Sequence, residues 1–158
     1  KVHTKKSTYL PDQRGEHWRR TLLEGLLPST ESIERIVAFL ANAPVAGFVA
    51  PRRWMGEVDE DIRNRRMIRH LERRGGIRAW GRARRIYPAG TMYWCGRNWL
   101  EFVRDLGLSA HEFDPEPLRH DAGIAHGVER VIGSFVADRR ASVWLTAFNA
   151  VPTETVIP

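Results

Sequence analysis

One arginine-rich stretch, residues 61–85, constrains how this chain can fold, because guanidinium groups have to stay near the protein surface. It carries ten basic and two acidic side chains, and all ten bases are arginines. Residues 1–60 carry 9 basic and 8 acidic side chains, a net charge of +1. Residues 86–158 carry 6 basic and 9 acidic side chains, a net charge of −3. Such clustering indicates a polyanion-binding surface. The alternative is a solvated helix, in which lysine and glutamate would normally share the surface.

The arginine-rich stretch has the period of an amphipathic helix from about residue 59 to residue 74. Acidic residues at 59–61 suit the first turn, and Gly75-Gly76 suits a C-terminal cap. At about 100° per residue, the apolar side collects Asn64, Met67, Ile68 and Leu71. The opposite side collects Ile62, Arg65, Arg66, Arg69 and Arg73, and one flank holds Arg63, His70 and Arg74. We predict that one face packs and the other presents guanidinium groups to solvent.

The flanking elements predict the order of a winged helix-turn-helix. Helical periods cover residues 16–27 and 30–42, and the short apolar stretch 45–55 is consistent with a brief second helix and a turn. After the arginine helix, aromatic and β-branched residues within 77–94, bounded by glycine and proline, predict a β-hairpin that would form the wing. A further helix follows over residues 99–106.

The C-terminal part has a different character. An acidic, proline-containing stretch precedes an apolar helical stripe, and a β-run at 142–146 follows. These two elements have the pattern expected at the opening of a second unit. The expected fold class is α+β and mostly helical: a winged helix-turn-helix with an N-terminal helix and a C-terminal helix-strand extension. We divide the chain into a basic arm and helix (1–28), the winged helix-turn-helix (29–108) and the C-terminal helix and strand (109–158).

Fold and charge together predict a double-stranded DNA-binding protein that acts in transcription, plasmid replication or mobilisation. An α-helix fits the major groove, and the arginine fork grips guanine or phosphate in bidentate fashion. Most such contacts go to phosphates, so affinity would fall steeply with salt. The predicted DNA-binding residues, on the helix and on the wing, are Arg63, Arg65, Arg66, Arg69, His70, Arg73, Arg74, Arg82, Arg84 and Arg85.

Three motifs resemble the replication-relaxation family of plasmids and conjugative elements. They are residues 67–77, residues 93–102 and the His120-Asp121 pair, and the resemblance covers about residues 31–136. It implies a winged helix-turn-helix followed by a nuclease-like α/β region, with a role in DNA replication or mobilisation. The chain departs from that pattern in stopping where the nuclease-like region would develop and in having Cys95 where a small hydroxylated residue is common. We therefore expect a protein that is not an enzyme.

Two other functions remain open from the sequence. The chain could be the DNA-recognition module of a nuclease or relaxase-associated enzyme, or an interaction protein that holds a partner through its wing and tryptophans. Winged helices often dimerise through terminal helices, so a homodimer through residues 16–27 or the last helix is a further expectation.

Candidate catalytic chemistry is sparse. His111, His120, Asp121 and His126 are the group that resembles a metal or hydrolase site, but His120-Asp121 is explained more simply as a helix cap. The acidic residues 57–61 precede a helix and lack the glycine-centred loop of a calcium site. No phosphate-cradling glycine loop is present. We predict neither a metal nor a cofactor.

Cysteine content and hydropathy give the expected location. The chain has one cysteine, Cys95, so it forms no intrachain disulfide. No apolar stretch approaches the length of a membrane span, and the N-terminus lacks the apolar region of a secretion signal. The expectation is a cytoplasmic protein with no membrane partner.

Overall fold

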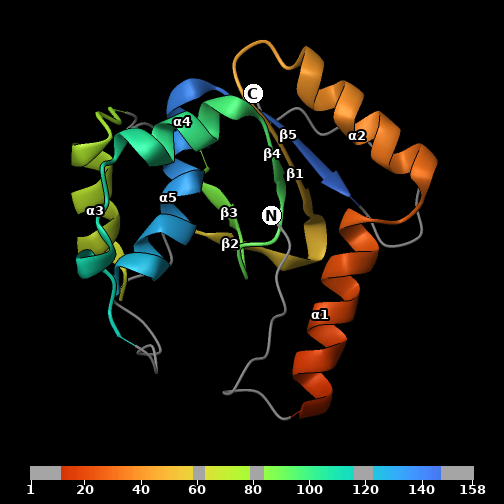
Figure 1. The fold of residues 1–158 in the computed structure, drawn as a ribbon, viewed down its shortest axis with the longest axis horizontal. Coiled ribbons are helices and arrows are strands. Elements are labelled where there is room, and N and C mark those ends of the chain that lie inside the picture. The colour runs from red at the N-terminus through yellow and green to blue at the C-terminus, as the bar shows by residue number, and fades with distance from the viewer. Residues whose placement is uncertain (1–11, 59–62, 79–83, 116–122, 147–158) are drawn as a thin grey trace.

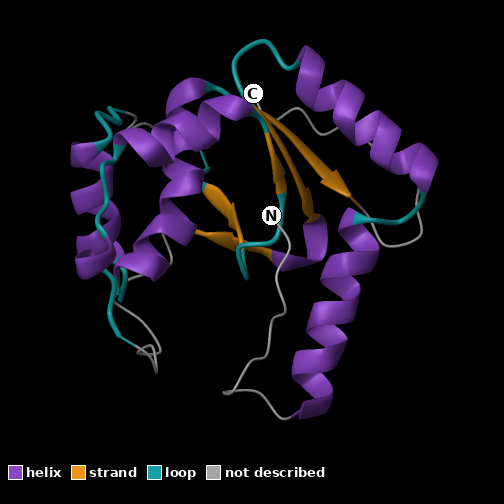
Figure 2. Ribbon diagram, in the orientation of Figure 1, coloured by secondary structure: helices purple, strands orange, loops and turns teal. Residues whose placement is uncertain are grey.

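The computed structural model describes residues 12–58, 63–78, 84–115 and 123–146. Its elements are α1 (Asp12–Leu26), α2 (Thr30–Asn42), β1 (Gly47–Pro51), a 3-10 turn (Arg52–Trp54), β2 (Met55–Glu57), α3 (Arg65–Arg74), β3 (Ile86–Pro88), β4 (Trp94–Cys95), α4 (Arg97–Asp105), a second 3-10 turn (Ala110–Glu112), α5 (Ile124–Arg139) and β5 (Ser142–Thr146). Helices surround two small sheets, with α3 at one end of the molecule and α1 and α2 at the other (Figures 1 and 2).

The larger sheet has the strand order β4-β1-β5. Strand β1 pairs in parallel with β5, from Gly47 opposite Ser142 to Pro51 opposite Thr146. It pairs antiparallel with β4 on its other side, where Phe48 lies opposite Cys95. The smaller sheet is an antiparallel pair of β2 and β3.

Strand β1 is the centre of the larger sheet, and all five of its residues are buried. Phe48 and Ala50 belong to the main core with α4 and α5, whereas Val49 packs with Ile36 of α2 and Trp144 of β5. An apolar run buried on both faces is typical of a strand that pairs with a parallel neighbour. The stretch 45–55, consistent in sequence with a brief helix and a turn, forms strand β1 over Gly47–Pro51, because its apolar residues are buried on both sheet faces, and the only helical turn described within it is the 3-10 turn Arg52–Trp54.

The expected hairpin is also absent from the part of the chain that the structure describes. Strand β3 pairs with β2, and Gly56 lies opposite Tyr87. Strand β4 pairs instead with β1, so the two expected hairpin strands belong to different sheets. The turn between them, Pro88 to Thr91, thus connects two sheets and forms no wing. The winged helix-turn-helix class as a whole stays a prediction.

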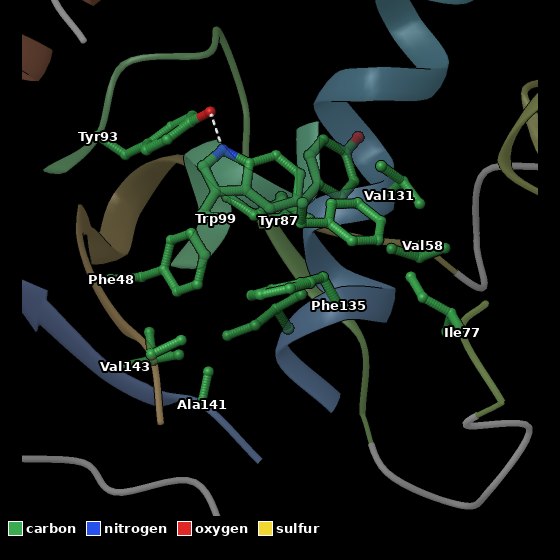
Figure 3. Packing of buried hydrophobic residues seen from close by; sticks show 14 of the residues in the cluster. Phe48, Val58, Ile77, Tyr87, Tyr93, Trp99, Val131, Phe135, Ala141 and Val143 are labelled. Carbon is green, nitrogen blue, oxygen red and sulfur yellow. Dashed lines mark hydrogen bonds between the residues drawn. The ribbon is translucent and has the colours of Figure 1, made fainter. Parts of the chain in front are cut away.

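The main core lies between the larger sheet and α3, α4 and α5. The Trp99 ring stacks on Phe102 at 5.4 Å and meets Phe48 and Phe135 edge-on at 5.9 and 5.3 Å. Its Nε1 donates to the Tyr93 hydroxyl at 2.8 Å, which satisfies a buried polar atom (Figure 3). Large aromatic rings in tilted contact contribute much of the stability of a core of this size.

Helical periodicity predicted the helices well. Ser29 accepts a hydrogen bond from the Ser32 amide at the start of α2, as its capping position predicts. Helix α1 covers the core through Leu22 and Leu26, as preferred from its pattern. Helix α5 and strand β5 lie where expected, but both have partners: β5 pairs with β1, and α5 packs in the main core. The division into three regions stays a prediction.

Candidate functional site

The arginine face of α3, defined here as Arg65, Arg66, Arg69 and Arg73, is exposed as predicted. The reverse side packs, with Ile68 2% exposed and Leu71 and Asn64 fully buried. Gly76, with φ +64°, ends the helix in the left-handed region, and the Ile77 amide donates to the Glu72 carbonyl at 2.9 Å. His70 is exposed on the flank. The described helix begins at Arg65, so Arg63 precedes it in a turn, and the expected start at residues 59–62 lies outside the described residues.

Arg74 has a structural role. Its Nη1 pairs with Glu112 at 2.6 Å, and its Nη2 donates to the Gly107 carbonyl at 2.7 Å. These bonds tie the end of α3 to the segment after α4. Proximity to Arg74 keeps the pKa of the Glu112 carboxyl below its ordinary value, chiefly through that hydrogen bond. Arg74 therefore stabilises the packing of α3 against the segment after α4, and it contributes little to an open binding face.

The arginines assigned to the wing are held by acidic residues. Arg84 pairs with Glu57 of β2. Arg85 is mostly buried and donates from Nη1 to Glu72 of α3 at 2.8 Å. Arg82 lies outside the described residues. Because β3 and β4 do not form a hairpin, Arg84 and Arg85 do not line a projecting wing.

Glu72 is the centre of a buried polar network that the sequence did not reveal. It is 2% exposed, although it lies on the most basic helix of the chain. Its Oε1 accepts hydrogen bonds from Arg85 at 2.8 Å and from the Ser134 hydroxyl of α5 at 2.6 Å. A buried carboxylate needs such partners to offset the loss of hydration. The network joins α3, the start of β3 and α5.

A second polar cluster lies between the turn after β3 and the first half of α5, and sequence reasoning missed it. The turn is unusual because two successive residues, Gly90 and Thr91, have positive φ of 90° and 55°. A β-branched residue in the left-handed region is strained, and such strain gathers at functional sites. Oε1 of Glu129 accepts from the Gly90 amide, and Oε2 pairs with Arg130 at 2.8 Å.

The same cluster contains Tyr87, Arg130 and His126. The Arg130 guanidinium lies 5.2 Å from the centre of the Tyr87 ring, and its Nη1 donates to the His126 carbonyl at 3.2 Å. Nδ1 of His126 is buried and has no hydrogen-bond partner among the described residues. We call Tyr87, Gly90, His126, Glu129 and Arg130 the loop–helix cluster. Both Glu129 oxygens are occupied, so its carboxylate positions the turn, whereas His126 keeps an unused ring nitrogen.

Metal chemistry finds no support among the residues described. No three His, Cys, Asp or Glu side chains there gather to hold an ion. His111 is exposed on the second 3-10 turn, and His120 and Asp121, predicted as a helix cap, lie outside the described residues. Burial raises the pKa of the Cys95 thiol above its ordinary value, so Cys95 has no activated thiolate.

The sequence contained a signal for the loop–helix cluster. His126, Glu129 and Arg130 are separated by three and four residues, the spacing that places side chains on one side of a helix. The apolar stripe of α5 is the stronger pattern in this part of the sequence, and it does not indicate what the polar side contacts. A turn with glycine followed by a β-branched residue was the second signal, but its strain shows only in the backbone dihedrals.

Comparison with known proteins identifies the family of the chain. A family model described as rhamnan synthesis protein F matches residues 1–141. Two curated relatives, both named uncharacterized protein WxcX, come from two strains of Xanthomonas campestris pv. campestris. Each aligns over 134 residues, at 34% and 33% identity, and each alignment covers 84% of this chain and 19% of the relative. The chain thus spans about a fifth of the length of these relatives. No solved structure matches.

These matches correct the interpretation of the sequence. The resemblance to the replication-relaxation family is wrong, because the family model covers nearly the whole chain and describes a different family. The predicted DNA-binding role in transcription, plasmid replication or mobilisation is wrong for the same reason. The link of the family to rhamnan synthesis also conflicts with the expectation of a protein that is not an enzyme. The homodimer and the cytoplasmic location stay predictions. No helix in the described ranges is long and apolar enough to cross a membrane.

Proposed function

The chain belongs to the rhamnan synthesis protein F family, and from this membership we propose that it acts in the synthesis of a rhamnose-containing polysaccharide, in a glycosyltransferase-related role. The family match over residues 1–141 is the observation that carries the proposal. Each alignment covers only 19% of the length of the curated relative. We therefore propose that this chain contributes to such an enzyme, without assigning it the whole reaction.

The loop–helix cluster is the part of the described structure best suited to contribute to sugar transfer. In glycosyl transfer the acceptor oxygen bonds the anomeric carbon of an activated sugar, the bond from that carbon to the leaving group breaks, and the hydroxyl proton is released. The reaction therefore requires fixed polar groups and a group that can take the proton. The strained Gly90-Thr91 turn, held by Glu129, provides a rigid framework. His126 provides an imidazole ring whose Nδ1 bonds no described side chain.

Within this proposal the residues have different roles. Glu129 is a positioning residue, because it bonds the Gly90 amide with one oxygen and Arg130 with the other. Arg130 is held between Glu129 and the Tyr87 ring, with its side chain 12% exposed. A guanidinium fixed in this way keeps its charge in a constant place. Replacing the side chain of His126 would remove the imidazole ring proposed to take the proton. The contacts of Glu129 with the Gly90 amide and with Arg130 would stay in place.

Deletion and complementation of the gene that encodes the chain test the proposal. Deletion should lower the rhamnose content of the surface polysaccharide of the organism that carries the gene, and the wild-type gene should restore it. A His126→Gln variant should restore at least tenfold less, because it lacks the imidazole ring, while His111→Gln, an exposed control, should complement fully. Unchanged rhamnose after deletion would reject the proposed function, and full complementation by His126→Gln would reject the role of His126.

A further inference from the structure

The arginine face of α3 has no part in the loop–helix cluster, so its purpose needs a separate explanation. Helix α3 contains five arginines and one acidic residue, Glu72. Glu72 is buried and bonded to Arg85 and Ser134, so it does not neutralise the outer surface. Arg74 is paired with Glu112. Arg65, Arg66, Arg69 and Arg73 are exposed, and Arg69 also has an interaction within the chain. The positive charge of this side therefore rests on Arg65, Arg66 and Arg73.

The spacing along the helix limits what this face can bind. Arg66 and Arg73 are seven residues apart, so they lie on one side at an axial distance of about 10 Å. One phosphate group cannot bridge that distance, which favours an extended polyanion over a small ligand. Guanidinium groups suit phosphate oxygens, because their planar fork donates two parallel hydrogen bonds.

The apolar side of α3 is not available for insertion into a bilayer. Ile68 and Leu71 are buried in the main core, and Met67 packs closely on Gly127 of α5. Binding through α3 would therefore be electrostatic, unlike that of an interfacial helix that buries its own apolar face. The helix lies at the end of the molecule away from α1 and α2 (Figure 1).

We propose that the arginine face of α3 docks the protein on a membrane surface that contains anionic phospholipids. Several exposed arginines on one helix side complement the negative potential of such a bilayer. Lipid headgroups diffuse laterally, so they match guanidinium groups at any spacing, and the family match removes the reason to favour DNA. The proposal rests on α3 and on the family, and it does not require the loop–helix cluster to act in sugar transfer.

Vesicle co-sedimentation of the purified protein tests the docking surface. Vesicles of phosphatidylcholine with about one-third phosphatidylglycerol should retain the protein, whereas pure phosphatidylcholine vesicles should not. Because the attraction is between exposed charges, raising salt from about 0.1 M to 1 M should weaken binding at least tenfold, as the screening length falls from about 10 Å to 3 Å. Binding should not change with vesicle curvature, because no apolar face is inserted.

Charge-matched variants locate the surface. Arg66→Gln with Arg73→Gln should weaken vesicle binding about tenfold or more, and lysine at both positions should retain most of it. The control, Arg20→Gln with Arg97→Gln, removes the same charge from exposed positions on α1 and α4 and should bind within about twofold of the wild type. Circular dichroism should show equal helix content in all three, because the replaced side chains are exposed.

Four outcomes would overturn the proposal. They are equal retention by neutral vesicles, equal loss in the control variant, displacement by millimolar inorganic phosphate, and tighter binding to a single-stranded polynucleotide than to the vesicles. Vesicle binding by the His126→Gln variant separates this proposal from the proposed function. Docking should remain intact in that variant, because His126 lies on α5, outside the arginine face.

Discussion

At the scale of single residues, the role of a charged side chain depends more on the groups that it contacts than on the sign of its charge. Arg85 and Arg66 look equivalent in the sequence, yet Arg85 bonds buried Glu72 whereas Arg66 is exposed. The sequence predicted correctly that Arg65, Arg66, Arg69 and Arg73 face solvent, because helical rotation alone fixes their side. It could not predict the pairing of Arg85 with Glu72, because that contact depends on how β3 packs against α3.

Replacing Glu72 tests the buried network. Glu72→Gln keeps the side-chain volume but removes the charge that Arg85 and Ser134 bond. We expect the free energy of unfolding to fall by about 2 kcal/mol, since a largely buried guanidinium loses the charged carboxylate that it bonds. Urea denaturation measures the loss. Exposed Glu34→Gln on α2 is the control and should stay within about 0.5 kcal/mol of the wild type.

The Tyr93 hydroxyl gives a pH-dependent prediction. Burial raises its pKa to about 12, with the hydrogen bond from Trp99 acting in the opposite direction. In the unfolded chain the tyrosine pKa is about 10. The contribution of Tyr93 is therefore fully present below pH ~10 and decreases by about 2–3 kcal/mol as pH rises to ~12, because the unfolded state ionises first. Unfolding free energies of wild type and Tyr93→Phe, measured from pH 8 to 12, should converge, and parallel curves would contradict the assignment.

At the scale of elements, local pattern predicted helices and failed on strand pairing. Helices α2 and α4 follow from their periodicity and caps. Strand β1 was misread as a helix because a short apolar run has no period that separates the two conformations. Strands β3 and β4 were expected to pair because they are neighbours in sequence, but each found a partner elsewhere. Pairing depends on contacts between distant segments, which a local pattern does not contain.

The close approach of α5 to β3 depends on Gly133. A Cβ there would lie 2.8 Å from the Ile86 carbonyl oxygen and 2.7 Å from Val58 Cγ2, and the carbonyl oxygen, as part of the backbone, has little room to move. Gly133→Ala should lower the free energy of unfolding by about 1–3 kcal/mol, because the helix must move away from the strand. Thermal or urea unfolding measures this. Gly96→Ala is the control: its Cβ would have ordinary contacts, the nearest at 3.5 Å, so the loss should stay within about 1 kcal/mol.

At the scale of the whole molecule, charge indicated a surface but not its partner. The net charge of +6 and its concentration in residues 61–85 are facts of the sequence, and they are equally compatible with nucleic acid, anionic lipid or an acidic protein. The fold did not separate these partners. The match to the rhamnan synthesis protein F family over residues 1–141 contradicts the predicted DNA-binding function, and the anionic lipid surface is our proposal.

Transfer of labelled rhamnose is the most direct test of the role in polysaccharide synthesis. Extracts of cells with and without the gene would receive a nucleotide-activated rhamnose donor, and label in high-molecular-weight polymer would be counted. We expect extracts without the gene to incorporate at least tenfold less label, and we expect the purified gene product to restore incorporation. Equal incorporation in both extracts would contradict it.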